Sequence, residues 1–595
     1  MNNLLTNKSY ALIEKNQEIT LYEGDIKKLS RLQDLEALQN NHSEIIFINP
    51  YSSIKEKEYK AHGNDPIIAL LVENKKTYSL NEINKVLPDK TLTIGGITTS
   101  LSDENFAEKV QEIKTHEIDT GNATQVILSR YFNTQIKDFS ELKALSLYKK
   151  ALGQHGQYMT FLFVDKSEEK PHYFIGTPPE RHVEITKDTI GMTPIAGTLK
   201  KTTKEDFPKE LEDFLNDPKE IQELFQVLDE EIKIMAHICP KGGRVKGPYL
   251  REIGGVVHTE YELEGSRNNN PIIDIFTHTL HAPTLIGGPL ESAARIIHRH
   301  ETESRRYYGG ELGILKNDTL DSAILIRCAE ISGNGMVRVQ AGAGIVSGSV
   351  PEKEMEETRA KASVFLRLLT HDNIAPQYLT TEREASIQPV LQKRNEQVSS
   401  FLFAPQEKPS QPSRNRRITI INNEDNFAEV ISHILQNLGY DVTVLDTFDF
   451  DMEKNRADVV ILGPGPGDIN DMKNPRMKKL HEITTSLFEQ KTPLLGICLG
   501  HQSILKHHHY SISQLERNTQ GVQKEIDVFG SIEKVGFYNS FAPQENNAPV
   551  LTFHKEHHIG LQFHPESVMT PNGQDILEEC LTALKEERQP NLSAS

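Results

Sequence analysis

Short apolar runs alternate with longer amphipathic stretches through the last third of the chain. Residues 418–422, 442–445 and 458–462 are apolar and have the length of buried strands. Helical stretches separate them, and a further apolar run at 492–497 continues the series. Strands that alternate with helices in this way are typical of an α/β domain with a parallel sheet. The pattern therefore predicts such a domain for the C-terminal region.

The first two thirds of the chain show a different pattern. Strand-like runs such as 126–132, 159–164 and 323–331 mix with longer helical patterns, which indicates an α+β fold with a large antiparallel component. A polar, proline-rich stretch at 404–414 is typical of an extended linker. We therefore predict four parts: a domain over 1–380, a linker over 381–415, a second domain over 416–585 and a tail over 586–595.

Two predicted helices each carry a pair of glutamates at helical spacing. The first helix begins near Asp217, a good N-cap residue, and places Glu220 and Glu223 on one face. The second begins at Pro351 and places Glu354 and Glu357 in the same relation. A single pair of this kind is most often a solvated helix face. Two pairs brought together would form an anionic oxygen site suited to Mg²⁺.

A nucleophile motif follows the predicted strand at 492–497. Cys498 stands between two glycines, in a Gly-x-Cys-x-Gly sequence where a strand runs into a helix. Such glycines allow the sharp turn of a nucleophile elbow, and a helix N-terminus favours the reactive thiolate. His564 and Glu566 lie two residues apart near a predicted strand end, so Glu566 could orient His564 while His564 activates Cys498. The alternative is a buried structural cysteine and an unrelated histidine.

Length, charge and cysteine content exclude several classes of protein. A chain of 595 residues is too long for one core. A formal net charge of −18 argues against a nucleic acid partner. Four scattered cysteines fit a reducing compartment, and we see neither an export signal nor an apolar run that could cross a membrane. We therefore expect a cytoplasmic protein with no membrane association.

Residues 416–585 resemble the class I glutamine amidotransferases. The resemblance rests on the Cys498 and His564 motifs and on the Gly-Pro alternation of residues 463–468. It implies that this domain hydrolyses L-glutamine to release ammonia, with backbone N–H groups of Gly465 and Leu499 stabilising the oxyanion. It also implies that the glutamine is held by Gln502, Ser540 and Phe541. The sequence Tyr-Asn-Ser-Phe at 538–541 replaces the commoner Tyr-His-Ser-Leu.

Residues from about 100 to 370 resemble the chorismate-utilising enzymes, which include anthranilate synthase and isochorismate synthase. The matching segments are Gln125–Arg130, Gly176–Glu180, Pro194–Thr198, Ile326–Arg327 and Gln340–Val346. The resemblance implies that Glu223 and Glu357 bind Mg²⁺, completed by Glu220 and Glu354, and that the metal holds the ring carboxylate of chorismate. The other implied contacts are Arg327 with the enolpyruvyl carboxylate, the backbone of Gly342 and Gly344, and the side chains of Tyr308 and Thr284.

Four positions bear on the chemistry that this resemblance implies. Family members that add water carry lysine where Gln125 stands, whereas ammonia needs no base. Members that form a covalent adduct carry lysine where Ala196 stands. Glu180 falls at the position of the general acid that protonates the departing C4 hydroxyl. His258 aligns with a histidine implicated in pyruvate elimination, although a hydrogen-bonding role is equally compatible with the sequence.

The two resemblances combine into one predicted reaction. We expect amination of chorismate at C2 to 2-amino-2-deoxyisochorismate, as in the phenazine-pathway synthases that stop before pyruvate elimination. One alternative is a fused anthranilate synthase that also eliminates pyruvate. Another is a non-catalytic chorismate-binding or regulatory protein, against which the intact Cys498, His564 and Glu566 argue. The resemblance also implies a homodimer.

Overall fold

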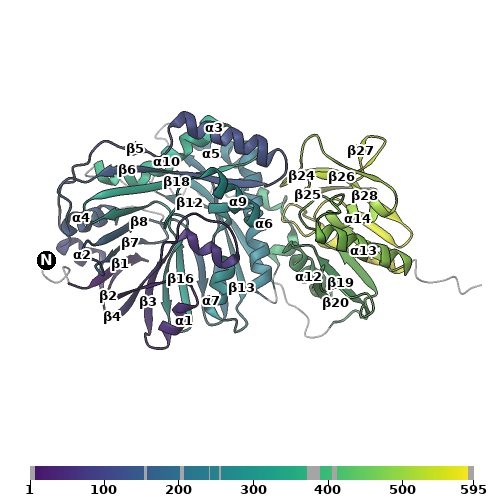
Figure 1. Cartoon of the computed structure of the whole chain (residues 1–595), viewed down its shortest axis with the longest axis horizontal. Helices are drawn as coiled ribbons and strands as arrows, with labels where there is room; N and C mark the ends of the chain where they lie inside the picture. The colour runs from purple at the N-terminus through teal and green to yellow at the C-terminus, as the bar shows by residue number, and fades with distance from the viewer. Residues whose placement is uncertain are drawn as a thin grey trace, which may run out of the picture. The chain divides into compact units, whose positions relative to one another are not determined.

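The computed structural model of the chain divides into two compact units (Figure 1). The first unit comprises residues 1–118, 125–227 and 247–389, and the second comprises 119–124, 228–246 and 390–595. The structure describes residues 7–152, 157–200, 207–239, 242–253, 256–370, 389–404 and 412–586. Residues 381–388 and 405–411 of the predicted linker and nearly all of the predicted tail lie outside these described residues, and the predicted domain boundaries stay predictions.

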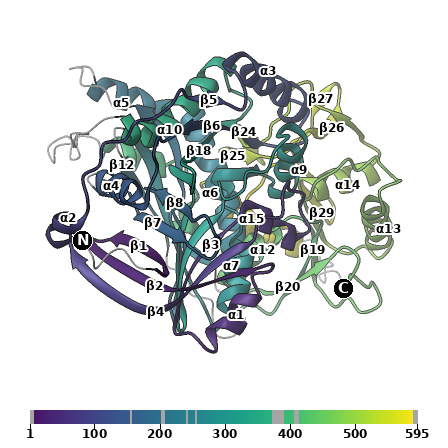
Figure 2. The same ribbon diagram turned by 60° about the vertical axis from the view of Figure 1, so that its left-hand side comes forward.

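One antiparallel sheet forms the framework of the first unit. Its strands pair in the order β6, β18, β17, β8, β7, β1, β2, β4, β3, β15, β16, β9, β10, β13 and β11. The curved neighbours β1, β2 and β4 are clearest in Figure 2. The strands are β1 (Ser9–Lys15), β2 (Glu18–Leu29), β3 (Glu44–Asn49), β4 (Ile67–Ser79), β6 (Gln125–Gln135), β7 (Thr160–Asp165), β8 (His172–Gly176), β9 (Arg181–Ile185), β10 (Thr189–Met192), β11 (Ile195–Lys200), β13 (Val256–Ser266), β15 (Glu311–Lys316), β16 (Thr319–Ile324), β17 (Cys328–Ser332) and β18 (Met336–Ile345). The predicted α+β fold with a large antiparallel component is confirmed.

The predicted strand at 323–331 is wrong, because the chain turns in its middle. Strand β16 ends at Ile324 and β17 begins at Cys328. The N–H of Ile326 donates to the carbonyl of Ile324 at 2.8 Å, and Arg327 has a φ of 53°. A positive φ is costly for a residue with a long side chain and tends to occur where function requires it. The apolar pattern is nearly continuous across this turn, so it did not reveal the break.

Two helices carry the glutamate pairs to the sheet. Helix α10 (Pro351–Thr370) buries Phe365, Leu368 and Leu369 in a core that also contains Val337 and Val339 of β18. Glu354 and Glu357 lie near its N-terminus, before this apolar stretch. Helix α6 (Pro218–Ile238) carries Glu220 and Glu223 in its first two turns. Both helices therefore begin where the sequence predicted them to begin.

The second unit contains a six-stranded sheet in the order β20, β19, β21, β22, β29, β28. All its pairings are parallel except that of β28 with β29. The strands are β19 (Arg417–Asn422), β20 (Asp441–Asp446), β21 (Val459–Leu462), β22 (Leu494–Ile497), β28 (Thr552–Lys555) and β29 (His558–Leu561). The helices that pack against this sheet include α12 (Phe427–Asn437), α13 (Pro475–Glu489), α14 (Leu499–His507) and α15 (Gly573–Glu586). The predicted α/β domain is confirmed.

None of the helices among the described residues combines the length and the apolar character that crossing a bilayer requires.

Candidate functional site

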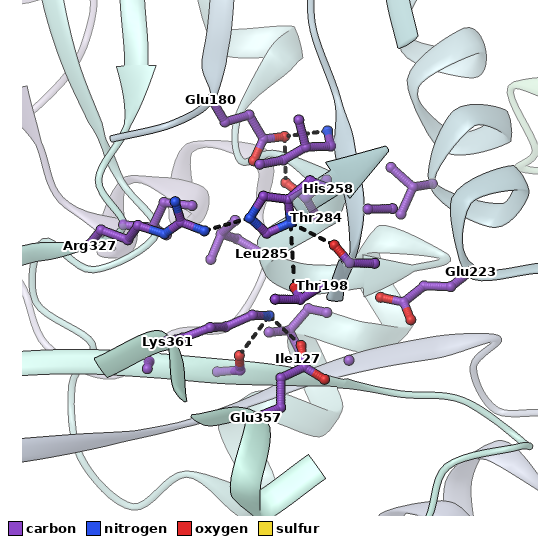
Figure 3. Close-up of a pocket in the computed structure, with 18 of the residues that line it drawn as sticks. Ile127, Glu180, Thr198, Glu223, His258, Thr284, Leu285, Arg327, Glu357 and Lys361 are labelled. Atoms are coloured by element: carbon purple, nitrogen blue, oxygen red, sulfur yellow. Dashed lines mark hydrogen bonds and ion pairs between the residues drawn. The ribbon is translucent and has the colours of Figure 1, made fainter. Parts of the chain in front are cut away.

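A cavity of about 750 Å³ opens in the first unit between its sheet and its helices. Figure 3 shows Glu180 and Glu357 at opposite ends of this cavity, with Arg327 and His258 between them. Ten of the predicted residues line it: Gln125, Glu180, Glu223, His258, Thr284, Tyr308, Arg327, Gly342, Gly344 and Glu357. The structure therefore brings together residues that lie up to 232 positions apart in the sequence, between Gln125 and Glu357.

Arg327 and His258 form a buried pair in the middle of the cavity. Arg327 Nη2 donates to His258 Nε2 at 2.5 Å, and His258 Nδ1 lies 2.6 Å from the carbonyl oxygen of Gly197. A guanidinium only donates and a carbonyl only accepts, so His258 is neutral with its proton on Nδ1. Burial and the charge of Arg327 lower the pKa of His258 well below 6.5, in agreement with this assignment.

Arg327 also keeps an unused donor in the cavity. Its Nη1 atom is buried and has no hydrogen-bond partner among the described residues. Burial lowers the pKa of Arg327 to about 10, against the opposing charge of Glu180, so the guanidinium stays positive at neutral pH. A buried cation with a free donor is suited to a planar carboxylate, which could accept two hydrogen bonds from it.

Glu180 lies in the link between β8 and β9 and is almost fully buried. Its Oε1 accepts hydrogen bonds from Thr284 Oγ1 at 3.1 Å and from the N–H of Ile195 at 3.4 Å. Both donors fix the carboxyl group in the wall of the cavity. The hydroxyl of Thr284 therefore orients the carboxyl group of Glu180 through this hydrogen bond.

The wall formed by β18 needs its glycines because other groups stand close to it. A Cβ added at Gly344 would lie 2.8 Å from Gln125 Nε2 and 3.2 Å from Glu223 Oε1. A Cβ at Gly342 would lie 3.0 Å from the hydroxyl of Tyr308. The absence of side chains at these two positions leaves room for a ligand near backbone groups.

The four glutamates surround lysines rather than one common point. Lys219 Nζ lies 3.6 Å from Glu220 Oε1, 3.6 Å from Glu223 Oε2 and 3.4 Å from Glu354 Oε1. Lys361 Nζ contacts Glu357 Oε1 at 2.7 Å. In the part of the chain that the structure describes, no three His, Cys, Asp or Glu side chains are grouped as metal ligands. Glu223 and Glu357 face the cavity, whereas Glu220 and Glu354 are not among the residues that line it.

The chemistry of these carboxylates nevertheless fits a hard cation. Glu220 Oε2 and Glu354 Oε2 are buried without a hydrogen-bond partner among the described residues. Burial, followed by the charge of Glu223, raises the pKa of Glu220 to about 8. Burial, followed by the charge of Glu357, raises the pKa of Glu354 to about 7. Unpaired carboxylate oxygens in a site with excess negative charge are what Mg²⁺ binds.

The two lysines of the site, Lys219 and Lys361, were not predicted from the sequence. Lys361 lines the cavity, and its Nζ also donates to the carbonyl of Gly342 at 3.2 Å. Its spacing of four from Glu357 on a helix was a signal that could have found it. Lys219 has the same spacing of four from Glu223 on helix α6, so the same signal applied to it.

The second unit contains the predicted nucleophile elbow. Cys498 lies between β22 and α14 with φ 51° and ψ −102°, a strained conformation for a residue with a side chain. A Cβ added at Gly496 would lie 2.6 Å from the backbone of Gly500, and one at Gly500 would lie 1.9 Å from the carbonyl oxygen of Leu462. Both glycines are therefore required for the close backbone approach that supports this turn.

Replacing Gly500 with alanine should destabilise the second unit. The added methyl group would collide with backbone, which cannot move aside as a side chain can, so we expect a loss of about 1–3 kcal/mol in the free energy of unfolding. Urea unfolding measures this loss. Gly96→Ala serves as the control, because nothing lies within 4 Å of its added Cβ. An unchanged unfolding midpoint for Gly500→Ala would contradict the described backbone packing.

His564 and Glu566 complete the elbow. His564 Nδ1 contacts Glu566 Oε1 at 2.7 Å, and both side chains are buried. Burial opposes a charge on His564, but Glu566 and Cys498 outweigh burial and raise the pKa of His564 well above 6.5. The three residues therefore form an interacting chain of thiol, imidazole and carboxylate, the arrangement that activates a cysteine nucleophile.

The predicted glutamine contacts cluster beside Cys498. Gln502 Nε2 donates to the carbonyl of Phe541 at 2.8 Å. Asn539, which departs from the commoner histidine, donates to the same carbonyl at 2.9 Å and so supports this backbone segment. Ser540 Oγ accepts from Gln520 Nε2 at 3.2 Å. The buried Gln562 was missed by the sequence analysis, although its Nε2 lies 3.8 Å from Cys498 Sγ.

The Gly-Pro segment of residues 463–468 lies close to Asn423. Asn423 Nδ2 donates to the carbonyl of Gly463 at 2.9 Å, and a Cβ added at Gly465 would lie 2.3 Å from the carbonyl oxygen of Asn423. Leu499 begins helix α14, immediately after the nucleophile. Gly465 and Leu499 carry the two predicted oxyanion donors. The backbone at Gly465 is fixed by a close contact that only glycine permits, and Leu499 lies at the N-terminus of a helix.

Comparison with known proteins gives two family matches. Residues 26–367 match the family described as chorismate binding enzyme, and residues 419–584 match glutamine amidotransferase class-I. A relative from Pseudomonas chlororaphis, named "Anthranilate synthase, phenazine specific", is 34% identical over 567 residues, which cover 90% of this chain and 87% of the relative.

More distant relatives match the first unit. Anthranilate synthase component 1 of Lactococcus lactis is 32% identical over 338 residues, which cover 55% of this chain and 70% of the relative. The solved menaquinone-specific isochorismate synthase of Escherichia coli has 20% sequence identity and a TM-score of 0.52, and the match covers 61% of this chain and 89% of that structure. This structural likeness supports the fold of the first unit.

Proposed function

Since the chain belongs to the chorismate binding enzyme family and also carries a glutamine amidotransferase class-I region, we propose that it aminates chorismate with ammonia from L-glutamine. The proposed product is 2-amino-2-deoxyisochorismate, with the pyruvyl group still attached. One observation carries the proposal most directly. Gln125, a side chain that cannot act as a base, lies in the cavity where family members that add water have lysine. The name of the Pseudomonas relative supports the same reaction class.

The second unit releases ammonia from glutamine. Cys498 attacks the side-chain amide of glutamine, and His564 transfers a proton to the departing nitrogen. Glu566 holds the ring of His564 through the 2.7 Å contact with Nδ1 and stabilises its positive charge. The N–H groups of Gly465 and Leu499 stabilise the oxyanion, and Gln502 and Ser540 hold the substrate. Water then hydrolyses the thioester and frees Cys498.

The cavity in the first unit binds chorismate. Arg327 uses its free Nη1 donor for the enolpyruvyl carboxylate, and the backbone at Gly342 and Gly344 contacts the same substrate. Glu223 and Glu357, supported by Glu220 and Glu354, would hold Mg²⁺. When bound, this ion would supply the positive charge that holds the ring carboxylate of chorismate.

The amination step needs an acid but no base. The lone pair of ammonia forms a bond to C2, the ring double bond shifts, and the C4–oxygen bond breaks. Glu180 gives a proton to the departing hydroxyl, which leaves as water, and the ammonium formed at C2 loses a proton. Thr284 positions Glu180 through the 3.1 Å hydrogen bond. Gln125 and Tyr308 shape the cavity around the ring.

An anthranilate synthase is the second candidate, because His258 lies in the cavity. Elimination of pyruvate would require a base that removes the C2 proton. His258 has its proton on Nδ1 and shares its Nε2 lone pair with Arg327, so it lacks a free basic nitrogen in this arrangement. This geometry favours a reaction that stops at the amino product. We also propose a homodimer, which rests on the family resemblance.

Analysis of the products tests this proposal. Chorismate, glutamine and Mg²⁺ should give an amino-dihydro acid that retains its three-carbon side chain, detected by liquid chromatography and mass spectrometry. Free pyruvate should stay below about a tenth of the product. The alternative enzyme would instead give stoichiometric pyruvate and a fluorescent aromatic amine, and that result would overturn the proposal.

A further inference from the structure

Lys219 links the two helices that carry the glutamate pairs. Its ammonium group lies near Glu220 and Glu223 of its own helix α6 and near Glu354 of helix α10. Its stem also packs toward the loop before α10, because a Cβ added at Gly348 would lie 3.6 Å from Lys219 Cγ. The ammonium therefore lies among carboxylates of both helices that would help to hold a shared metal.

The ammonium group of Lys219 makes long contacts with three different carboxylates. All three distances lie between 3.4 and 3.6 Å, whereas a charge-assisted hydrogen bond is about 2.7–2.9 Å long. The ammonium thus neutralises three carboxylates without a tight bond to any one of them. Its side chain is 26% exposed, so it has a path to solvent. Glu354 Oε2, in a residue that is only 1% exposed, stays unpaired beside it.

The site can hold more negative than positive charge. With all four glutamates ionised and Lys219 displaced, the ammonium of Lys361 leaves three negative charges, and a divalent ion would neutralise two of them. Lys361 is tied to Glu357 at 2.7 Å and to the carbonyl of Gly342, so it is held by the cavity wall. Among the ion pairs that the structure describes, the ammonium of Lys219 has none shorter than 3.4 Å. Of the two lysines, Lys219 is the one that can leave.

We propose that Lys219 is a built-in counter-ion that occupies the carboxylate site in the metal-free enzyme and that Mg²⁺ must displace from Glu220, Glu223 and Glu354. This inference rests on the proposed function, because it concerns the magnesium site of that reaction. Its consequence is a lowered Mg²⁺ affinity, since each binding event must move a cation out of the site. A second consequence is that the contacts of Lys219 hold helices α6 and α10 together in the absence of the metal.

Titration calorimetry with Mg²⁺ alone, on the full chain, tests the proposal. Lys219→Met removes the competing charge and keeps a stem of similar length, so we expect Mg²⁺ to bind about tenfold more tightly than in the wild type. Lys353→Met is the matched control, since Lys353 is an exposed lysine near the start of α10. Unchanged or weaker binding in Lys219→Met, with wild-type binding intact, would overturn the role of Lys219.

Thermal unfolding gives a second measurement, which distinguishes the proposed role of Lys219 from a general folding defect of the variant. Without Mg²⁺, Lys219→Met should unfold at a lower temperature than the wild type, because the carboxylates then repel one another unopposed. Saturating Mg²⁺ should remove this difference, because the metal binds only the folded state. Lys219→Gln should behave in the same way. A deficit that persists in Mg²⁺ would mean a purely structural ion pair and would contradict the proposal.

The failure of the proposed function has a different signature. If wild type and Glu223→Gln gave the same calorimetric trace, these carboxylates would not be the metal site at all. In that case the magnesium assignment itself would fail, and not only the role of Lys219.

Discussion

Cys498→Ala should lower glutamine-dependent turnover by a factor on the order of 10⁴ or more, while ammonium-dependent turnover stays within about twofold of the wild type. The thiol is the only nucleophile in the chain of contacts that includes His564 and Glu566, so no other group can form the thioester. Ammonia supplied from solution bypasses that step and needs only the cavity of the first unit. Steady-state assays with either nitrogen source measure the two rates.

Cys580→Ala is the matched control for this experiment. Cys580 is also a buried thiol of the second unit, in helix α15, and should be dispensable for both nitrogen sources. A Cys498→Ala enzyme that ammonium salts do not rescue would contradict the proposed division of labour between the two units. A variant that keeps its glutamine-dependent activity would contradict the role of the elbow.

Glu223→Gln should lower turnover at least about 100-fold with glutamine and with ammonium alike. The substitution keeps the size of the side chain but removes one of the two carboxylates that face the cavity, and metal sites depend strongly on each charged ligand. The loss should not depend on the nitrogen source, because chorismate binding is common to both reactions. Mg²⁺ titrations of activity should show a higher half-saturating concentration for the variant.

Glu356→Gln controls for the loss of one negative charge near this site. Glu356 is exposed on helix α10, next to Glu357 in sequence. Covalent labelling of Cys498 by a glutamine-analogue electrophile should be unchanged in Glu223→Gln, which shows that the second unit is intact. Full activity of Glu223→Gln with ammonium would contradict the assignment of this glutamate to the chorismate site.

Local sequence patterns predicted those parts of the site that short segments determine. The spacing of Glu354 and Glu357 follows from helix geometry alone, and α10 begins at Pro351 as predicted. The glycines around Cys498 specified a turn that only a few backbone conformations satisfy. The resemblance to two families then supplied the partners that local patterns could not identify, such as Glu180 and Arg327.

Contacts between distant segments could not be read from the sequence. The turn before Arg327 interrupts a run that looks like one strand, because the apolar pattern reports burial and not the backbone angle of one residue. The pairing of His258 with Arg327 joins strand β13 to that turn, 69 positions away. The spacing of four between Lys219 and Glu223 indicates one contact on α6, but the contact with Glu354 depends on the approach of α10, which the sequence does not show.

Mass spectrometry of the product formed from amide-¹⁵N glutamine shows directly whether the nitrogen of glutamine reaches chorismate. We expect a chorismate-derived amine that is one mass unit heavier than the product from unlabelled glutamine and that retains its pyruvyl group. The label should disappear when Cys498→Ala is assayed with unlabelled ammonium and labelled glutamine together. An unlabelled product from the wild-type enzyme with labelled glutamine as the only nitrogen source, or no aminated product at all, would contradict the account.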